Sequence, residues 1–378
     1  MKKNYLLTPG PTPLPPQVLE AMSRPIIHHR TPAFQAILKE ATEGLKYVFQ
    51  TTSDVFIISS SGTGAMEGAL INLLSAGDTA LVVHGGKFGE RWTEIAKAYG
   101  IVAEIIDVQW GKAVNPLDIA ARLKANPKIK AVFTTLCETS TGVTNDIEAI
   151  GRIVKDTQAV LVVDAISGLG AIDIKTDAWN CDLVVAGSQK GLMLPPGLGF
   201  ISVSPKAWKL IETSKSSRYY LDLRKAKKAL DKTDTPFTSS ITLIIALNEA
   251  LKMIKADGLE NIFARHKKMA EATRAAMQGL GLELFAPSAA SDAVTAVNVP
   301  AGVDGEKLVK TMRDTFGVTI AGGQDELKGK VFRIAHMGYI GEFDIILGIS
   351  CLEKVLQQSG YKFNLGAGVK AAEEIFLR

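Results

Sequence analysis

Between residues 40 and 205, short apolar runs rich in Val, Ile and Leu alternate with longer stretches of helical periodicity. Uninterrupted apolar runs are typical of strands buried on both faces, and the helices between them are typical of the crossovers that join parallel strands. This pattern predicts an α/β fold with a mainly parallel central sheet. In such a sheet ligands bind beyond the carboxyl ends of the strands, which is where site residues are sought. The expected strands are residues 54–58, 79–83, 131–134, 159–163, 183–185 and 199–203.

The pattern changes after a long predicted helix at 241–256. Later strands, at 294–299 and 331–335, are separated by a helix and followed by two more, which indicates a smaller α+β domain. Prolines crowd residues 8–16 and exclude a helix there, so that segment is expected to form an ordered arm. The 378 residues are therefore predicted to divide into an N-terminal arm (1–18), a large domain (19–256) and a small C-terminal domain (257–378).

The charge and the cysteines narrow the range of partners. The formal net charge is +4, and the basic residues are spread along the chain, which argues against a nucleic-acid binder. Cys137, Cys181 and Cys351 have no metal-binding spacing and are odd in number, so neither a zinc site nor a disulfide framework is expected. No apolar run approaches the ~20 residues of a membrane helix, and no signal-peptide pattern is found. We therefore expect a cytoplasmic protein with no metal, nucleic-acid or membrane partner.

A candidate phosphate site follows the strand at 54–58, where the chain reads Ser59-Ser60-Ser61-Gly62-Thr63-Gly64 before a helix. Small residues and hydroxyls at a helix N-terminus suit phosphate, because free N–H groups and the positive end of the helix dipole face the anion. An ordinary N-cap turn uses the same residues. The loop does not match a dinucleotide fingerprint, since Glu67 stands at the third glycine position and no acidic residue follows about 20 residues later.

Four other strand ends carry groups that are unusual after an apolar run: Asp164, Thr139, Phe88 and Lys190. Each has an ordinary explanation when taken alone, such as a turn, simple packing or a surface lysine. Together with the candidate phosphate loop they match one ligand, pyridoxal 5′-phosphate. Its aldehyde forms a Schiff base with a lysine, its ring nitrogen takes an acidic partner, and its phosphate binds backbone amides and hydroxyls.

The chain resembles the class V, fold-type I pyridoxal-phosphate-dependent aminotransferases, and within them the alanine–glyoxylate and serine–pyruvate branch. The resemblance covers nearly the whole chain. It implies a homodimer with shared active sites. It rests on Pro9-Gly10-Pro11, Ser61-Gly62-Thr63-Gly64-Ala65-Met66-Glu67, Glu138-Thr139-Ser140-Thr141-Gly142-Val143, Val163-Asp164-Ala165, Ser188-Gln189-Lys190, Pro195-Pro196-Gly197 and Phe332-Arg333-Ile334.

The resemblance also implies a role for each matching residue. Lys190 would hold the cofactor and move a proton, and Asp164 would pair with the ring nitrogen; these are the expected catalytic residues. Arg333 would bind the substrate carboxylate and Gly10 would line the substrate pocket, although Arg333 alone reads more readily as a surface ion pair. The other cofactor-binding residues would stack on the ring (Phe88), bond its hydroxyl (Thr139) or surround its phosphate (Ser61, Gly62, Thr63, Gln189 and, from the neighbouring subunit, Thr238).

The implied reaction is a ping-pong transamination between a small amino acid, alanine or serine, and a 2-oxo acid, glyoxylate or pyruvate. The alternative is a class V aminotransferase that uses aspartate or an aminophosphonate, for which Arg30, Arg91 or a neighbouring subunit would supply a second cationic group. A cysteine desulfurase would need a mobile, exposed cysteine, and neither Cys137 nor Cys351 is expected on such a loop. A dinucleotide-dependent dehydrogenase lacks its fingerprint here.

Overall fold

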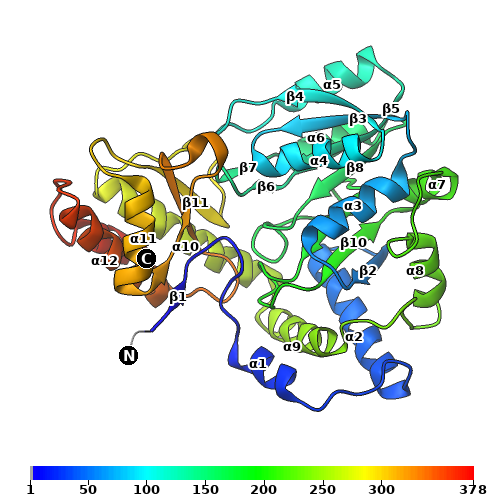
Figure 1. Ribbon diagram of the computed structural model, residues 1–378, viewed down its shortest axis with the longest axis horizontal. Helices are drawn as coiled ribbons and strands as arrows, with labels where there is room; N and C mark the ends of the chain where they lie inside the picture. The colour runs from blue at the N-terminus through cyan, green and yellow to red at the C-terminus, as the bar shows by residue number, and fades with distance from the viewer. Residues whose placement is uncertain (1–2) are drawn as a thin grey trace.

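The computed structural model describes residues 3–378, and its largest element is a seven-stranded sheet in the order β2-β10-β9-β8-β5-β3-β4 (Figure 1). Strand β10 runs antiparallel to both of its neighbours, β2 and β9, whereas the other pairings are parallel. The predicted mainly parallel α/β sheet is therefore confirmed. The strands are β2 (Asp54–Ile58), β3 (Thr79–His84), β4 (Val102–Asp107), β5 (Ile129–Thr135), β8 (Val160–Asp164), β9 (Leu183–Gly187) and β10 (Gly199–Val203).

The apolar pattern does not predict β4, which is the edge strand beside β3. Its sequence, Val102-Ala103-Glu104-Ile105-Ile106-Asp107, is interrupted by carboxylates, and Val102 is exposed. Because an edge strand has a neighbour on one side alone and faces solvent on the other, it does not need an uninterrupted apolar run. The continuous runs therefore identify the five inner strands and the other edge strand, β2, but not β4.

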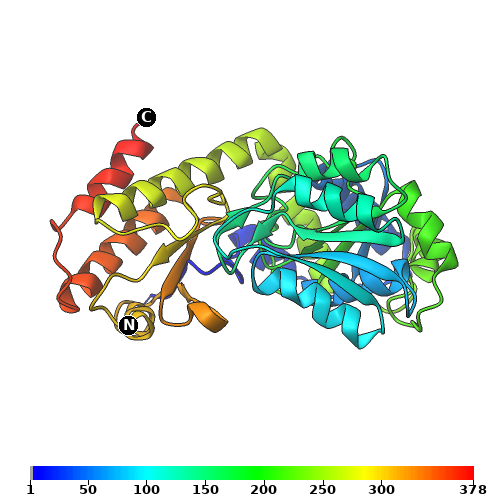
Figure 2. The same ribbon diagram turned by 90° about the horizontal axis from the view of Figure 1, so that it is seen from above.

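The sheet is covered by helices on both faces, and successive residues of each strand enter different cores (Figure 2). In β8, Leu161 and Val163 belong to one core, whereas Val160 and Val162 belong to the other. This alternation explains why the runs are apolar at every position. Helices α2 (Pro32–Phe49), α5 (Pro116–Ala125), α6 (Ile147–Val154) and α9 (Ile241–Asp257) pack into the first core, and α3 (Gly62–Leu73), α4 (Lys87–Ala98), α7 (Pro205–Thr213) and α8 (Leu223–Leu230) into the second.

The C-terminal part has a hydrophobic core of its own, to which Met277, Phe332 and Leu352 contribute. Its sheet has the order β11-β14-β13 with antiparallel pairings. The predicted α+β character is present, and the domain boundary at residue 257 stays a prediction. Within residues 3–378 no helix combines the length and apolar composition needed to cross a bilayer. The elements are α10 (Leu259–Gly279), β11 (Val294–Asn298), α11 (Gly305–Phe316), β12 (Val318–Thr319), β13 (Ala321–Gly322), β14 (Val331–Ala335), α12 (Glu342–Gln358) and α13 (Ala367–Phe376).

The N-terminal arm joins the two parts of the chain. Its short strand β1 (Tyr5–Leu6) pairs in parallel with β12, and Leu7 is buried in the C-terminal core. The arm then turns toward the large sheet, where the Thr12 hydroxyl donates to the carbonyl oxygen of Lys190 at 3.1 Å. Helix α1 (Pro16–Ser23) follows, and its first residue is the last proline of the arm.

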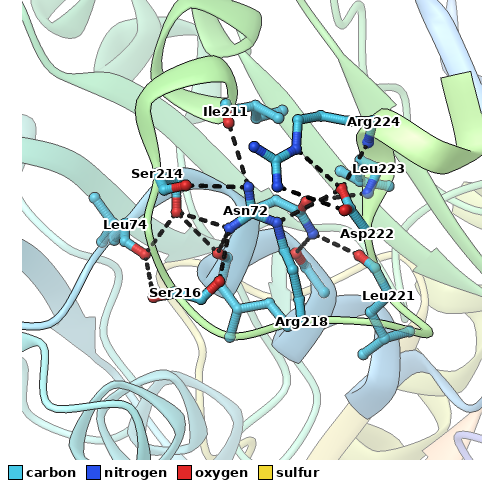
Figure 3. Close-up of polar contacts among 12 residues, drawn as sticks. Asn72, Leu74, Ile211, Ser214, Ser216, Arg218, Leu221, Asp222, Leu223 and Arg224 are labelled. Atoms are coloured by element: carbon cyan, nitrogen blue, oxygen red, sulfur yellow. Dashed lines mark hydrogen bonds and ion pairs between the residues drawn. The ribbon is translucent and has the colours of Figure 1, made fainter.

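A buried polar network connects α3 to the segment between α7 and α8 (Figure 3). The Arg218 side chain is 1% exposed, and its guanidinium donates to the carbonyl oxygens of Ile71 and Ser216 at 3.1 and 3.0 Å. The Asn72 side chain donates to the Leu221 carbonyl at 2.6 Å and accepts from the Leu223 amide at 3.0 Å. Because the N-terminal end of α3 lies at the cavity described below, this network stabilises the helix that borders it.

We expect Arg218→Met to lower the free energy of unfolding by about 3 kcal/mol, because it leaves the buried carbonyl oxygens of Ile71 and Ser216 without their hydrogen-bond donor. The matched control is Arg224→Met, since Arg224, like Arg218, contacts the Asp222 carboxylate, at 3.2 Å, but is half exposed. Arg224→Met is expected to lower the free energy of unfolding by less than about 1 kcal/mol. Urea unfolding of both variants measures the difference, and equal losses would contradict this account of the network.

Candidate active site

A cavity opens at the carboxyl ends of the central strands, and it brings together residues from five separate stretches of the sequence. Most of the residues predicted to bind a cofactor line it, although their roles stay predictions. Arg91, Cys137, Ile166 and Ser167 complete the lining. The predicted residues in the cavity wall are Ser61, Gly62, Thr63, Phe88, Thr139, Asp164, Gln189 and Lys190.

Lys190 stands on the turn that follows β9, and its side chain is buried at 9% exposure. Burial lowers the pKa of its amine to about 8, because a charged ammonium loses hydration in the interior. The amine donates to the carbonyl oxygen of Pro9 in the arm. No carboxylate of residues 3–378 forms an ion pair with it, so near neutral pH the uncharged, nucleophilic form of the amine is far more accessible than that of an exposed lysine.

Asp164 ends β8 inside the same cavity and is 4% exposed. One carboxylate oxygen accepts a hydrogen bond from the Ile166 amide at 2.8 Å. Burial raises the pKa of Asp164 to about 7, and that bond opposes the shift only in part. A buried carboxylate of this kind is stabilised as the anion when a cationic group of a ligand lies beside it.

The loop after β2 forms an anion cradle at the start of α3. The Ser61 hydroxyl caps the helix by accepting from the Gly64 amide at 3.4 Å, and the first helical N–H groups have no partner within the helix. A side chain at Gly62 would meet Ile166 at 2.7 Å, so the backbone itself borders the cavity. The buried amide oxygen of Gln189 has no hydrogen-bond partner among the described residues. These groups fit a phosphate ester.

Helix α3 begins at Gly62, three residues before the predicted start at Ala65. Gly62 and Gly64 disfavour a helix by propensity, but the Ser61 cap and the packing of the first turn override this preference. The earlier start matters for the site, because it places the free N–H groups of the first turn at the cavity rather than one turn away from it.

Two cavity residues, Phe88 and Arg91, come from the first five residues of α4. Phe88 presents its ring, and the Arg91 guanidinium carbon lies 4.8 Å from the centre of that ring. Arg91 also donates to the Thr63 hydroxyl at 3.4 Å, and no carboxylate of residues 3–378 pairs with it. The sequence suggests Arg91 as one of three possible second cationic groups, and the structure places Arg91 in the cavity wall.

Thr139 and two neighbours that the sequence does not predict as cofactor-binding residues, Cys137 and Ser167, complete the polar wall. The Thr139 hydroxyl donates to Ser167 at 2.5 Å. The Cys137 thiol is buried and lies 3.2 Å from the Ser291 hydroxyl, and burial raises its pKa to about 12. A thiol with so high a pKa is a poor nucleophile, in line with the case against a desulfurase. Ser167 lies three residues after Asp164, and this closeness in sequence is the one feature from which its place in the cavity could have been predicted.

Arg333 lies on β14 and is buried, so the surface ion pair that its sequence context favours is wrong. Its guanidinium donates to the carbonyl oxygens of Thr139 at 2.9 Å and Gly322 at 2.7 Å. Burial lowers its pKa to about 10. Because it contacts the backbone of Thr139, Arg333 lies directly behind the cavity wall rather than in it.

Gly10 and Thr238 lie at different distances from this cavity. Gly10 has φ +104°, and a side chain there would come within 2.5 Å of the Lys190 amine, so close approach requires glycine. Thr238 is exposed and lines a separate hollow with Ser59 and Tyr220. Its predicted contact with a cofactor is therefore not made within its own chain.

Residues 3–378 contain no group of three or more His, Cys, Asp or Glu side chains placed to hold a metal ion. All three cysteines are unpaired thiols.

The model of the family Aminotransferase class-V matches residues 4–335. A protein from Anabaena cylindrica named soluble hydrogenase 42 kDa subunit is 48% identical over 99% of both chains. An L-aspartate–glyoxylate aminotransferase from Paracoccus denitrificans and a serine–glyoxylate aminotransferase from Methylorubrum extorquens are each 38% identical over 98% of this chain, covering 96% and 95% of their own lengths.

A solved structure of an alanine–glyoxylate aminotransferase from Nostoc sp. superposes with a TM-score of 0.91 at 31% identity, and the match covers 94% of this chain and 96% of that one. The buried lysine, the buried aspartate and the anion cradle of the cavity agree with membership of this family. The protein described here thus belongs to the class V aminotransferases and is an aminotransferase with the fold-type I architecture.

Proposed function

We propose that this aminotransferase binds pyridoxal 5′-phosphate and transfers the amino group of a small neutral amino acid, alanine or serine, to glyoxylate or pyruvate in a ping-pong cycle. The observation that carries the proposal is the meeting of Lys190 and Asp164 in one buried cavity beside the α3 anion cradle. A buried amine, a buried carboxylate and a set of free backbone N–H groups suit an aldehyde, a ring nitrogen and a phosphate.

The cavity residues would hold the phosphate, the ring and the ring hydroxyl of the cofactor. Ser61, Gly62, Thr63 and Gln189 would bind its phosphate, Phe88 would cover its ring, and Thr139 would bond its hydroxyl. When bound, pyridoxal phosphate would supply an aldehyde that accepts the amino group and a ring that withdraws electrons from the substrate Cα. The Asp164 carboxylate favours a protonated ring nitrogen because the two charges are opposite.

Lys190 would move the proton. Its amine has a pKa lowered to about 8, so the uncharged form is available near neutral pH to take the Cα proton of the amino acid and hold it at Nζ. Arg333 would bind the α-carboxylate of the same substrate in bidentate fashion, which needs its guanidinium to exchange the Thr139 carbonyl for the substrate. These contacts would orient the Cα–H bond toward Lys190.

We also propose a homodimer in the cytoplasm. Thr238 is exposed and does not line the cavity of its own chain, and it follows Phe237, which stacks on the exposed ring of Tyr220 with centroids 5.2 Å apart. An aromatic pair with one exposed ring beside Thr238 favours contact with a second subunit, to whose cofactor the hydroxyl would reach. The unpaired cysteines favour a reducing compartment.

An acidic amino donor is a second candidate, and one observation favours it. Arg91 lines the cavity without a carboxylate partner among the described residues, so it offers a place for a side-chain carboxylate. One relative is named an L-aspartate–glyoxylate aminotransferase, while others are named for serine. The neutral donor stays the first proposal, because the Arg91 guanidinium lies on the Phe88 ring and contacts Thr63.

The test is an absorption titration of the purified protein loaded with pyridoxal phosphate. We expect a visible band that decreases when L-serine or L-alanine is added and returns when glyoxylate or pyruvate follows. L-aspartate is the comparison, and a faster response to it would favour the acidic donor. A protein that develops no visible band after incubation with the cofactor would refute the proposal.

Replacing Arg333 with glutamine is expected to raise the KM for the amino donor by ~10- to 100-fold and to lower kcat less, since a charged hydrogen-bond pair to the substrate is lost. Arg265→Gln is the matched control, because Arg265 likewise donates to two carbonyl oxygens, those of Gly338 and Ile340, at 3.1 Å. Steady-state kinetics with L-serine separates the two variants. An unchanged KM in Arg333→Gln would refute its binding of the carboxylate.

A further inference from the structure

Helix α4 starts without a capping side chain of its own. Its N-cap residue is Gly86, which has no side chain to accept from the first N–H groups. Instead, the segment that contains β6 (Cys137–Glu138) supplies all three acceptors. The Lys87 amide donates to the Ser140 hydroxyl at 3.0 Å, and the amides of Phe88 and Gly89 donate to one carboxylate oxygen of Glu138 at 3.1 and 2.9 Å.

The Glu138 carboxylate is fully engaged and almost fully buried, with 1% exposure. Its second oxygen accepts from the amide and the hydroxyl of Ser140, at 3.1 and 2.6 Å. Burial raises its pKa, and these hydrogen bonds act in the opposite direction. No arginine or lysine within residues 3–378 pairs with it. Its partners are therefore the first turn of α4 and its own strand end, where the positive end of the helix dipole stabilises an anion.

The start of α4 packs tightly against the segment that contains Glu138 and against β3. A side chain at Gly86 would come within 2.4 Å of the Ser140 hydroxyl, and one at Gly89 within 2.4 Å of the Val83 carbonyl oxygen. The first turn of α4 thus contacts β3 at Gly89 and is hydrogen-bonded to Glu138. Phe88 belongs to this turn, and its ring reaches the cavity wall.

We propose that Glu138 is a positioning residue, whose buried carboxylate fixes the first turn of α4 and so holds the Phe88 ring in place for the cofactor. The inference rests on the proposed function, since Phe88 is there assigned to the cofactor ring. Glu138 does not touch the cofactor in this account. Removing its hydrogen bonds frees the turn, and the aromatic face loses its fixed orientation.

The test is Glu138→Gln, in which an NH₂ group replaces one accepting oxygen, so at least one backbone N–H loses its acceptor. We expect the dissociation constant for pyridoxal phosphate to rise about 10-fold. It is measured by titrating the cofactor-free protein and following the visible absorbance. The visible circular dichroism of the bound cofactor is expected to weaken as well, because it reports how firmly the ring is held.

Glu353→Gln is the matched control. Glu353 is also a buried carboxylate that accepts backbone N–H groups at the start of a helix, from Gly366 at 2.7 Å and Gly368 at 2.9 Å, but it lies in the C-terminal part. Both variants are expected to lose similar thermal stability, and Glu138→Gln alone should lose cofactor affinity. Equal cofactor affinity in the two variants, with the unchanged protein binding normally, overturns the inference and leaves the proposed function intact.

A double-variant comparison tests the route of the effect. If Glu138 acts through Phe88, then Glu138→Gln should weaken binding little further in a Phe88→Leu background, so the two losses are not additive. Full additivity overturns the inference. Should Glu138→Gln fail to fold, Ser140→Ala removes one acceptor and one donor from the same contact, and the same direction of change, about 3-fold, is expected. No change in cofactor affinity in Ser140→Ala would then count against it.

Discussion

Lys190→Ala is expected to lower turnover of L-serine and glyoxylate by about 10,000-fold and to abolish the visible absorbance of the lysine-linked cofactor. Lys190 carries the only amine among the described residues that line the cavity, so no neighbour replaces it as a base. The cavity keeps its anion cradle in this variant, and the cofactor should still bind, more weakly. Turnover and the absorption spectrum of the same preparation measure both effects.

The matched control is Lys206→Ala, because Lys206 is a partly buried lysine of the same domain that pairs with Asp182. Its turnover should match that of the unchanged protein. Added ethylamine should restore part of the activity of Lys190→Ala, since a small amine fits the space that the side chain leaves. Turnover retained in Lys190→Ala without added amine would sink the assignment of the catalytic base.

Asp164→Asn should lower kcat by ~10- to 1000-fold, which corresponds to the one to three pKa units by which a neighbouring carboxylate favours a cation. The substitution isolates the charge, because the asparagine oxygen can still accept from the Ile166 amide as Asp164 does. Turnover under saturating substrate is the measurement. The loss should be largest above the pKa of Asp164, which is about 7, and should shrink as the pH falls below it, because the unchanged protein then also carries a neutral side chain at this position.

Asp182→Asn is the control for this substitution. Asp182 is a buried aspartate at the opposite end of the neighbouring strand, where it accepts from the Leu161 amide and the Ser204 hydroxyl at 2.9 Å each. It should cost stability without changing kcat. A kcat in Asp164→Asn equal to that of the control would mean that the charge at Asp164 has no part in the reaction.

The sequence predicts the inner strands and the cavity well because both follow from local rules. Each inner strand is one continuous apolar run, and the carboxyl ends of parallel strands meet at one edge, so Asp164 and Lys190 could be placed together before any contact was known. The edge strand β4 and the early start of α3 escape these rules. In both places tertiary contacts, and not local propensity, decide the structure.

The part that the sequence does not predict consists of contacts between segments distant along the chain. Glu138 reads as one residue of a motif, and nothing in its neighbourhood reveals that it caps a helix about 50 residues earlier. Arg333 reads as a surface arginine, yet its partners are the backbone of Thr139 and of Gly322. Such partners are fixed only when the sheets are assembled, so periodicity and spacing carry no signal for them.

The pairing of β1 with β12 has a consequence for the order of events during synthesis. Tyr5 leaves the ribosome well before its strand partner Val318, which follows more than 300 residues later. We therefore expect the arm to remain unpaired while the large sheet forms, and Gly10 to reach Lys190 only after the C-terminal core has closed. Contacts of this sequence separation form late because the long intervening loop must first be ordered. A nascent chain stalled before residue 318 would have Lys190 in the large sheet without the arm packed against it. The complete site would therefore form only at the end of folding.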